Sequence, residues 1–198
     1  MQVNMILIII LIFVLATFWI CLGILSVLLW PRISNFISKK IVKNKYLSLG
    51  TSSQERLIYE LKDTVEYLSK KRIGALITLE NNESLDNLRT DGIILNANLS
   101  SSLLIAIFSK ESPIHDGAVI IRDNKIYYAS TFYKITKKSL DNSFGSRHRA
   151  ALGISEQSDA TTIVVSEETG VISILKGGLM TKVPISEFKE TLLKYIKD

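Results

Sequence analysis

Cysteine and histidine are scarce in this sequence, and their scarcity excludes several kinds of site. The 198 residues include one cysteine, Cys21, and two histidines, His115 and His148. A lone cysteine cannot form a disulfide or a cysteine-based metal site within the chain. The two histidines are 33 residues apart, so a His-Glu-x-x-His zinc motif is absent as well.

The common motifs of nucleotide-binding and acyl-transfer enzymes are also missing. The sequence has no Gly-x-x-x-x-Gly-Lys-Ser/Thr loop, no Gly-x-Gly-x-x-Gly after a strand and no Gly-x-Ser-x-Gly elbow. A nucleotide, if the chain binds one, must therefore be held in a less common way.

Acidic residues are absent from the first 50 positions. The net charge is +5, and residues 51–198 carry 19 basic and 19 acidic side chains, so the excess lies wholly in residues 1–50. A nucleic-acid-binding protein carries its basic surface on the folded domain, so we expect no nucleic-acid partner. The basic residues of this segment are Arg32, Lys39, Lys40, Lys43 and Lys45.

Residues 5–30 form a long uncharged run that predicts a transmembrane helix. Its 26 residues exceed the roughly 20 needed to span a bilayer. A cleavable signal peptide is disfavoured because no basic residue precedes the run and no Ala-x-Ala site follows it. The basic residues that follow predict a single-pass protein of the cell membrane whose remainder is cytoplasmic. We therefore predict an anchor at 1–30 and a basic connector at 31–52.

Residues 53–198 predict one α/β (α+β) domain, with a mixed central sheet and helices on both faces. Ser52 and Glu55 have the spacing of a capping box before an amphipathic helix at 53–71. Further helices are predicted at 100–110, 147–156 and 185–196, and strands at 73–80, 92–95, 118–122, 125–132, 161–166 and 170–175. The strand order cannot be deduced from these patterns.

The most distinctive stretch of the domain is 145–151, Gly-Ser-Arg-His-Arg-Ala-Ala. Arg147 and Arg149 can each hold two phosphate oxygens in fixed geometry, and the small flanking residues leave access to them. Taken alone, the stretch is equally well explained as a solvated basic turn.

Two other groups could join the arginines in a site. Asp116–Gly117 precedes a strand, where the carboxylate could hold a divalent cation or accept a proton. Ser166 and Glu168 lie in a turn between two strands. An ordinary Asp-Gly turn and a solvated acidic hairpin tip are the simpler explanations of these groups. Together, however, arginines, a cation-binding carboxylate and a base are what phosphoryl transfer requires.

These residues resemble a known family. Asp116–Gly117–Ala118 and the 145–151 stretch are similar to the two signature motifs of diadenylate cyclase domains, which make cyclic di-AMP from two ATP. The resemblance extends from about Ile73 to Ser173, and the single N-terminal span resembles a one-helix variant of the membrane-anchored branch. It implies that residues 53–198 form a diadenylate cyclase catalytic domain.

The resemblance implies a head-to-tail homodimer, stable or transient, in which each domain holds one ATP. Each 3′-hydroxyl attacks the α-phosphate of the other nucleotide and releases pyrophosphate. Asp116 is the implied catalytic residue, and it shares a divalent metal, Mn²⁺ or Mg²⁺, with His115. The implied ATP-binding residues are Gly117, Ala118, Tyr133, Ser146, Arg147, His148, Arg149, Ser166 and Glu168.

Two departures from the family pattern and two alternative functions remain. Anchored relatives often have Thr at the position of Ser146, and Tyr-Leu-Pro where this chain has Phe132–Tyr133–Lys134, which affects the expected adenine contacts. A membrane-anchored sensor that binds ATP or a cyclic dinucleotide without turnover is the first alternative. A metal-dependent phosphodiesterase using His115 and Asp116 is the second, although such sites usually need more ligands.

Overall fold

The structure is a computed structural model that divides the chain into two compact units, residues 1–42 and 43–198. It describes residues 2–41, 46, 50–138 and 144–197, with side chains of the first range described at 10–30. Lys43 and Lys45 of the predicted connector lie outside the described residues. Because the two units are not placed relative to each other, each is considered separately.

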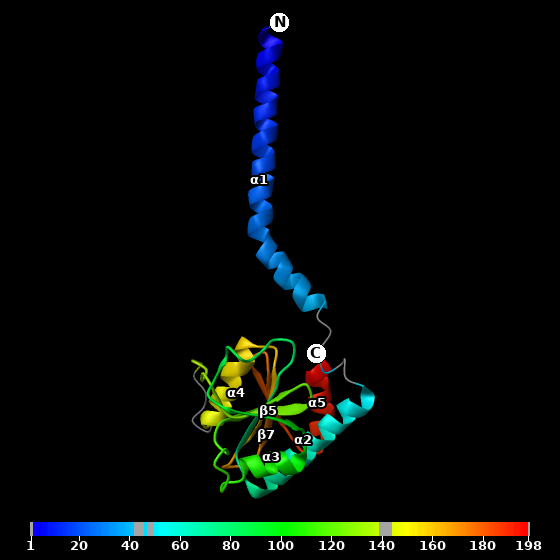
Figure 1. The fold of residues 1–198 in the computed structure, drawn as a ribbon, viewed down its shortest axis with the longest axis vertical. Coiled ribbons are helices and arrows are strands. Elements are labelled where there is room, and N and C mark those ends of the chain that lie inside the picture. Colours follow the sequence, from blue (N-terminus) through cyan, green and yellow to red (C-terminus); the bar gives the residue numbers. More distant parts are fainter. Residues whose placement is uncertain (1, 42–45, 47–49, 139–143, 198) are drawn as a thin grey trace. The chain divides into compact units, whose positions relative to one another are not determined.

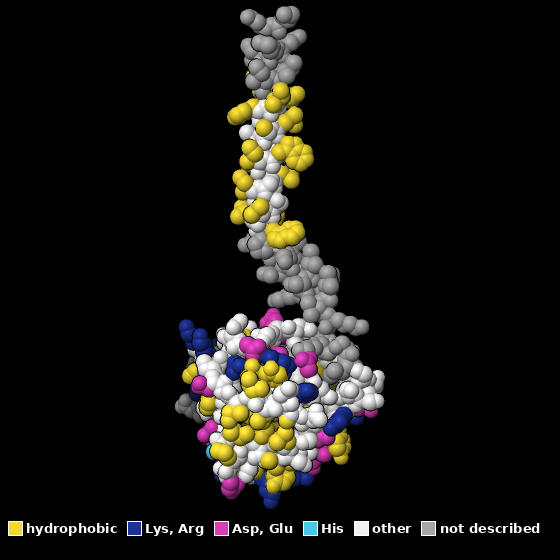
Figure 2. Space-filling view, in the orientation of Figure 1, with side chains coloured by type: hydrophobic (Ala, Val, Ile, Leu, Met, Phe, Trp, Pro, Cys, Tyr) yellow, Lys and Arg dark blue, Asp and Glu magenta, His cyan; other side chains and the backbone are white. Residues whose placement is uncertain are grey.

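The first unit consists of one helix, α1 (Gln2–Ile41). Its segment Ile10–Trp30 has a mean hydropathy of 2.7 over 21 residues, so it is long and apolar enough to cross a membrane. Figure 2 shows hydrophobic side chains along this segment and no charged ones. The helix continues past residue 30, where we predicted the end of the anchor, and the proposed division at 30 and 52 stays a prediction.

The second unit is built on one mixed sheet (Figure 1). Its order is β2-β5-β4-β1-β6-β7-β8, and β3 also pairs with β5. Only β1 and β4 are parallel among the described strand pairs. The strands are β1 (Ala75–Leu79), β2 (Arg89–Thr90), β3 (Ile93–Asn98), β4 (Ala118–Arg122), β5 (Lys125–Tyr133), β6 (Thr161–Val165), β7 (Ile172–Lys176) and β8 (Leu179–Val183).

Helices cover both faces of the sheet and enclose two hydrophobic cores. Apolar residues of α2 (Thr51–Lys71), α3 (Ser101–Phe108) and α5 (Phe188–Lys197) pack on one face. Those of α4 (Ser146–Gln157) pack on the other. Strand β1 is buried along its whole length because alternate side chains enter each core: Ile77 belongs to the first and Leu76 to the second. The predicted fold class is confirmed.

Three details differ from the predictions. The capping box at Ser52 and Glu55 is wrong: α2 begins at Thr51, and its N-cap is Gly50, whose carbonyl accepts from the Ser53 and Gln54 amides. The short strand β2 and the edge strand β8 were not predicted. Strand β3 extends three residues beyond the predicted end, to Asn98.

Candidate active site

The sheet topology brings distant segments of the chain to one end of the central strands. Ala75 at the start of β1 pairs with Val165 at the end of β6, and Ala118 at the start of β4 pairs with Thr131 near the end of β5. Because β1 and β4 are parallel, both starts lie at the same end of the sheet. The segments that carry the candidate residues therefore converge there.

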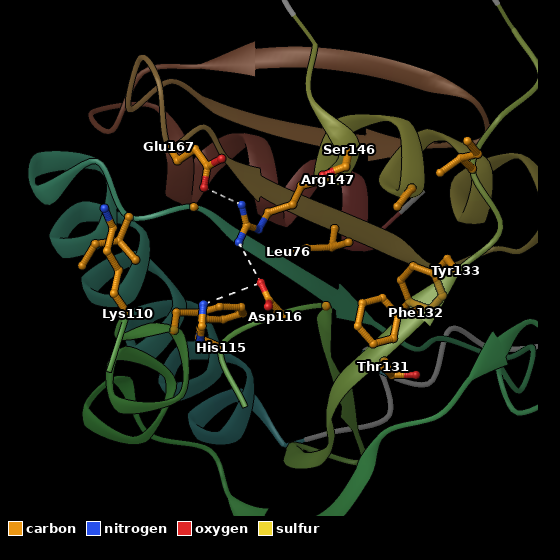
Figure 3. Close-up of a pocket in the computed structure, with 16 residues that line it drawn as sticks. Leu76, Lys110, His115, Asp116, Thr131, Phe132, Tyr133, Ser146, Arg147 and Glu167 are labelled. Carbon is orange, nitrogen blue, oxygen red and sulfur yellow. Dashed lines mark hydrogen bonds and ion pairs between the residues drawn. The ribbon is translucent and has the colours of Figure 1, made fainter. Parts of the chain in front are cut away.

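A cavity of about 560 Å³ lies at this end, which is within the usual range for a small-molecule site. Figure 3 shows that its two sides differ in character. Charged side chains gather on one side, from the loop before β4, the first turn of α4 and the loop after β6. Phe132 and Tyr133 lie on the opposite side, and Leu76 lies between the two sides. The apolar lining also includes Ile135 and Ala150.

The charged side contains a chain of four polar groups. Arg147 Nη1 lies 2.7 Å from Glu167 Oε2, and Arg147 Nη2 lies 4.0 Å from Asp116 Oδ1. Asp116 Oδ1 is in turn 3.6 Å from His115 Nε2. Both carboxylates are largely exposed, at 71% for the Asp116 side chain and 59% for Glu167, so a ligand can reach them.

The tautomer of His115 follows from its hydrogen bond. Nδ1 lies 2.6 Å from the Ser112 carbonyl oxygen, which can only accept, so Nδ1 carries the proton in the neutral ring. The lone pair is then on Nε2, which faces Asp116. A backbone hydrogen bond of this kind is the usual support of a metal-binding histidine.

Arg147 is seated against the backbone of Gly74, just before β1. A Cβ atom on Gly74 would lie 2.5 Å from Arg147 Nη1 and 2.9 Å from Glu167 Oε2, so only glycine leaves room for this ion pair. Arg147 Nε is buried and has no hydrogen-bond partner among the described residues. The guanidinium is therefore fixed in place while part of its donor capacity stays unused.

The cavity brings together some of the residues predicted for ATP binding and metal binding. His115, Asp116, Gly117, Tyr133, Ser146 and Arg147 line it. A second cavity of about 30 Å³ is lined by both Ser146 and Arg147 and also by His148, Ser166 and Glu168. Ala118 and Arg149 line neither: Ala118 is buried in the core, and the Arg149 carbonyl accepts a hydrogen bond from the Thr136 amide.

The surroundings of two predicted residues, Gly117 and His148, constrain what each can do. Gly117 has a φ of +87°, and a Cβ atom would lie 2.6 Å from the Thr131 carbonyl, so glycine is needed for the packing of β4 on β5. His148 is buried, and burial, reinforced by the positive charge of Lys182, lowers its pKa below the ordinary value. Its imidazole is thus neutral at neutral pH. It could donate a hydrogen bond to an anion but would bring no positive charge.

Several lining residues were missed by sequence reasoning. Glu167 lies between Ser166 and Glu168, which were predicted, but no pattern indicates which acid of the pair faces Arg147. Gly74 is far in sequence from both signature motifs, and only the sheet topology brings it to the cavity. Lys110 lies six residues before Asp116, but no sequence pattern indicates that it lines the cavity. Phe132, by contrast, belongs to the segment Phe132–Tyr133–Lys134 that was expected beside the adenine, and it lines the cavity.

The residues present suit a divalent cation that is bound mainly through a ligand. Among the described residues no cluster of three or more His, Cys, Asp or Glu side chains could hold a metal by itself. Asp116 and the free lone pair of His115 Nε2 nevertheless offer two adjacent ligands. Mg²⁺ is commonly held by one or two carboxylates together with substrate phosphates, a pattern that Asp116 fits, whereas an imidazole nitrogen suits transition metals.

A protein-family model matches residues 62–180, and its description is "DisA bacterial checkpoint controller nucleotide-binding", abbreviated DAC. The match covers more than half of the chain and includes both signature motifs and the cavity. The chain belongs to the DAC family. The resemblance noted in the sequence is thereby confirmed.

Curated and solved members of the DAC family agree with this assignment. A diadenylate cyclase of Listeria monocytogenes is 46% identical over 152 residues, covering 76% of this chain and 56% of the relative. One from Mycoplasma genitalium is 40% identical over 185 residues, covering 91% and 90%. The crystal structure of a DacA double mutant from Staphylococcus aureus matches with a TM-score of 0.71 and 39% identity, over 75% of this chain and all of that one. The chain thus spans little more than half of the Listeria relative.

Proposed function

We propose that this chain is a diadenylate cyclase that condenses two ATP molecules into cyclic di-AMP and releases pyrophosphate. The observation that carries the proposal is the cavity in which Asp116 and Arg147 face each other across 4.0 Å, beside an apolar wall. The apolar side suits a purine base, and the charged side suits a triphosphate. The names of the DAC relatives support the same activity.

The size of the cavity supports a reaction between two copies of the chain. About 560 Å³ accommodates one small ligand, whereas the product joins two nucleotides. We therefore place the second nucleotide in the cavity of another domain. The 71% exposure of Asp116 fits this arrangement, because its carboxylate remains accessible to a nucleotide presented from outside.

In the proposed step, the 3′-hydroxyl oxygen of one nucleotide bonds to the α-phosphorus of the other, and the bond from that phosphorus to the pyrophosphate oxygen breaks. Asp116 accepts the hydroxyl proton. Arg147 and Ser146 hold phosphate oxygens, and the first turn of α4 presents its free amides to the same anion. The apolar side, including Tyr133, positions the adenine, so catalysis relies mainly on orientation and charge stabilisation.

Asp116 and His115 Nε2 would hold the divalent cation, Mg²⁺ or Mn²⁺, which would neutralise charge on the phosphate oxygens. We further propose that residues 1–30 anchor the chain in the cell membrane, with the connector at 31–52 and the catalytic domain at 53–198 in the cytoplasm. The apolar segment of α1 and the basic residues that follow it support this orientation.

The test is product formation by the full chain in detergent micelles. ATP with Mg²⁺ or Mn²⁺ should yield cyclic di-AMP and two pyrophosphates per product, identified by chromatography and mass spectrometry. Because each product needs two domains, the rate per chain should rise with chain concentration until the pairs are saturated. A rate per chain that is constant on dilution to isolated monomers would contradict the face-to-face arrangement.

The non-catalytic sensor is the principal alternative. It predicts nucleotide binding with no cyclic di-AMP under either metal. A phosphodiesterase would instead consume cyclic di-AMP without making it, so incubation with each nucleotide separately distinguishes all three functions.

A further inference from the structure

In the 560 Å³ cavity, the lysine and arginine side chains are matched in number by aspartate and glutamate side chains before any ligand binds. Among the described lining residues, Lys110 and Arg147 are basic, and Asp116 and Glu167 are acidic. Both acids lie within 4.0 Å of Arg147, so they offset much of its positive charge. Lys110, in contrast, forms no ion pair with a described residue.

A hydrogen-bonded turn holds Lys110 on the charged side of the cavity. Glu111, its acidic neighbour, is engaged by the Ser109 hydroxyl, which donates to Oε2 at 2.6 Å. The Ser112 amide donates to the Ser109 carbonyl, and the His115 amide donates to the Ser112 carbonyl. Figure 3 shows Lys110 beside His115, on the side of the cavity opposite Phe132 and Tyr133.

These observations have a chemical consequence for an anionic ligand. Arg147 must share its donors with Glu167 and Asp116. The exposed ammonium group of Lys110 forms no ion pair with a described residue, and its acidic neighbour Glu111, which attracts it through space, is hydrogen-bonded to Ser109. An ammonium group on a flexible stem can follow a phosphate chain as a mobile point charge. Resting on the proposed function, we infer that Lys110 binds phosphate oxygens of the nucleoside triphosphate held in this cavity.

The experiment measures binding separately from turnover. The ligand is 3′-deoxy-ATP, which lacks the attacking hydroxyl, titrated with Mg²⁺ into the full chain in detergent micelles by calorimetry. Lys110→Ala should weaken binding about tenfold, the size of one lost charge-assisted contact at an exposed site. Lys110→Arg keeps the charge and should stay within about threefold of the unmodified chain. Lys189→Ala, at an exposed position of α5, should leave the affinity unchanged.

Adenosine distinguishes a lost phosphate contact from a damaged cavity. It has no phosphate, so it should bind the unmodified chain and Lys110→Ala equally well. Equal binding of 3′-deoxy-ATP by those two chains, or an equal loss of adenosine and 3′-deoxy-ATP affinity in Lys110→Ala, would overturn the inference.

The two proposals fail in different ways. If the unmodified chain makes no cyclic di-AMP but its affinity for 3′-deoxy-ATP depends on Lys110, the cyclase proposal fails and the phosphate contact stands. If it makes cyclic di-AMP while Lys110→Ala binds 3′-deoxy-ATP normally, the contact fails and the cyclase proposal stands.

Discussion

A cluster of an arginine and two carboxylates lies near each end of β4. Arg147 is the arginine at the cavity end and Arg122 the one at the other end, and the two clusters differ. Just past the end of β1, the Glu80 carboxylate accepts hydrogen bonds from Arg122 Nε at 2.6 Å and from Nη2 at 2.7 Å. The Asp86 carboxylate accepts a hydrogen bond from the same Arg122 Nη2 at 3.0 Å and another from the Tyr128 hydroxyl at 3.1 Å. The Glu80 side chain is only 4% exposed. We call this cluster closed because Arg122 satisfies the buried Glu80 carboxylate. At its edge, Asp86 also lies 3.5 Å from Nε of a second arginine, Arg89, and that buried nitrogen has no hydrogen-bond partner among the described residues.

The cluster at the cavity end is open. Arg147 makes one short contact, to the exposed Glu167, and a 4.0 Å contact to the exposed Asp116, while its buried Nε lacks a described partner. The same residue types thus stabilise the fold around Arg122 and Glu80, whereas around Arg147 they remain able to bind a ligand. The exposure of both carboxylates to a ligand, rather than the presence of charges, distinguishes the candidate site.

The largest expected effect comes from removing the acid at the open cluster. Asp116→Asn preserves the shape of the side chain but removes its charge and its capacity to accept a proton. We expect cyclic di-AMP formation to fall by about 10³-fold or more, with folding and binding of 3′-deoxy-ATP largely retained. Product analysis, calorimetry and circular dichroism measure these quantities, and retained synthesis would remove Asp116 from the proposed role.

Breaking the closed cluster should instead cost stability. Arg122→Met leaves the buried Glu80 carboxylate without its partner, and we expect the free energy of unfolding to fall by about 3 kcal/mol. Urea unfolding of the full chain in micelles, followed by circular dichroism, measures this loss. The double variant Arg122→Met, Glu80→Gln is the control and should recover part of it. A loss below about 1 kcal/mol in the single variant would contradict a closed, buried pair.

Gly74→Ala should disturb the open cluster without unfolding the domain. The new Cβ would collide with the end of the flexible Arg147 side chain, which can move away, so the melting temperature should change little. We expect product formation to fall about 10- to 100-fold because Arg147 leaves its position. Gly153→Ala is the matched comparison: its Cβ would meet the Lys134 carbonyl of the backbone, so it should destabilise the domain. Equal loss of stability in both variants would refute the distinction.

The smallest effect concerns acid stability at the closed cluster. Burial opposes ionisation of Asp86, but hydrogen bonds from Arg122, Ser84 and Tyr128 prevail and lower its pKa to about 2. The folded pKa is below the unfolded value near 4, so the contribution is present at neutral pH and is lost as the pH falls from about 4 to 2. Asp86 is 45% exposed, so we expect only about 1 kcal/mol or less. Urea unfolding should show Asp86→Asn to be less stable than the unmodified chain at pH 7, and this difference should shrink by pH 3.

The predictable part of the fold lies where local pattern and burial agree. The continuous apolar strands β1, β4 and β6 and the periodic helix α2 follow directly from the sequence. The helix start was misjudged, since Ser52 and Glu55 have the right spacing for a cap but Gly50 takes that position. Strand β8 could have been found from Gly177–Gly178, because both residues have positive φ and this pair is a common hairpin turn.

The site was predictable only as far as its signature motifs. Asp116 and Arg147 were identified from residue chemistry and a family resemblance, and both line the cavity. Gly74 was not, because its proximity depends on which strands pair and in which direction. Lys110 and Glu167 lie close in sequence to predicted residues, but no pattern shows that they line the cavity. Ala118 also belongs to a signature motif; its side chain lies in the core, and its predicted role in ATP binding stays a prediction.

The unpaired Nε of Arg147 also creates a trade-off between the stability of the ligand-free domain and its affinity for the ligand. A buried donor without an acceptor costs about 1–3 kcal/mol, and a phosphate oxygen that reached Nε after a shift of the Arg147 side chain would return that free energy. The ligand-free domain is therefore less stable than its fold alone would allow, and ligand binding should raise its melting temperature. A substitution that supplied an internal acceptor to Nε would stabilise the empty domain and weaken its hold on the ligand. Selection for function should thus keep this donor unsatisfied.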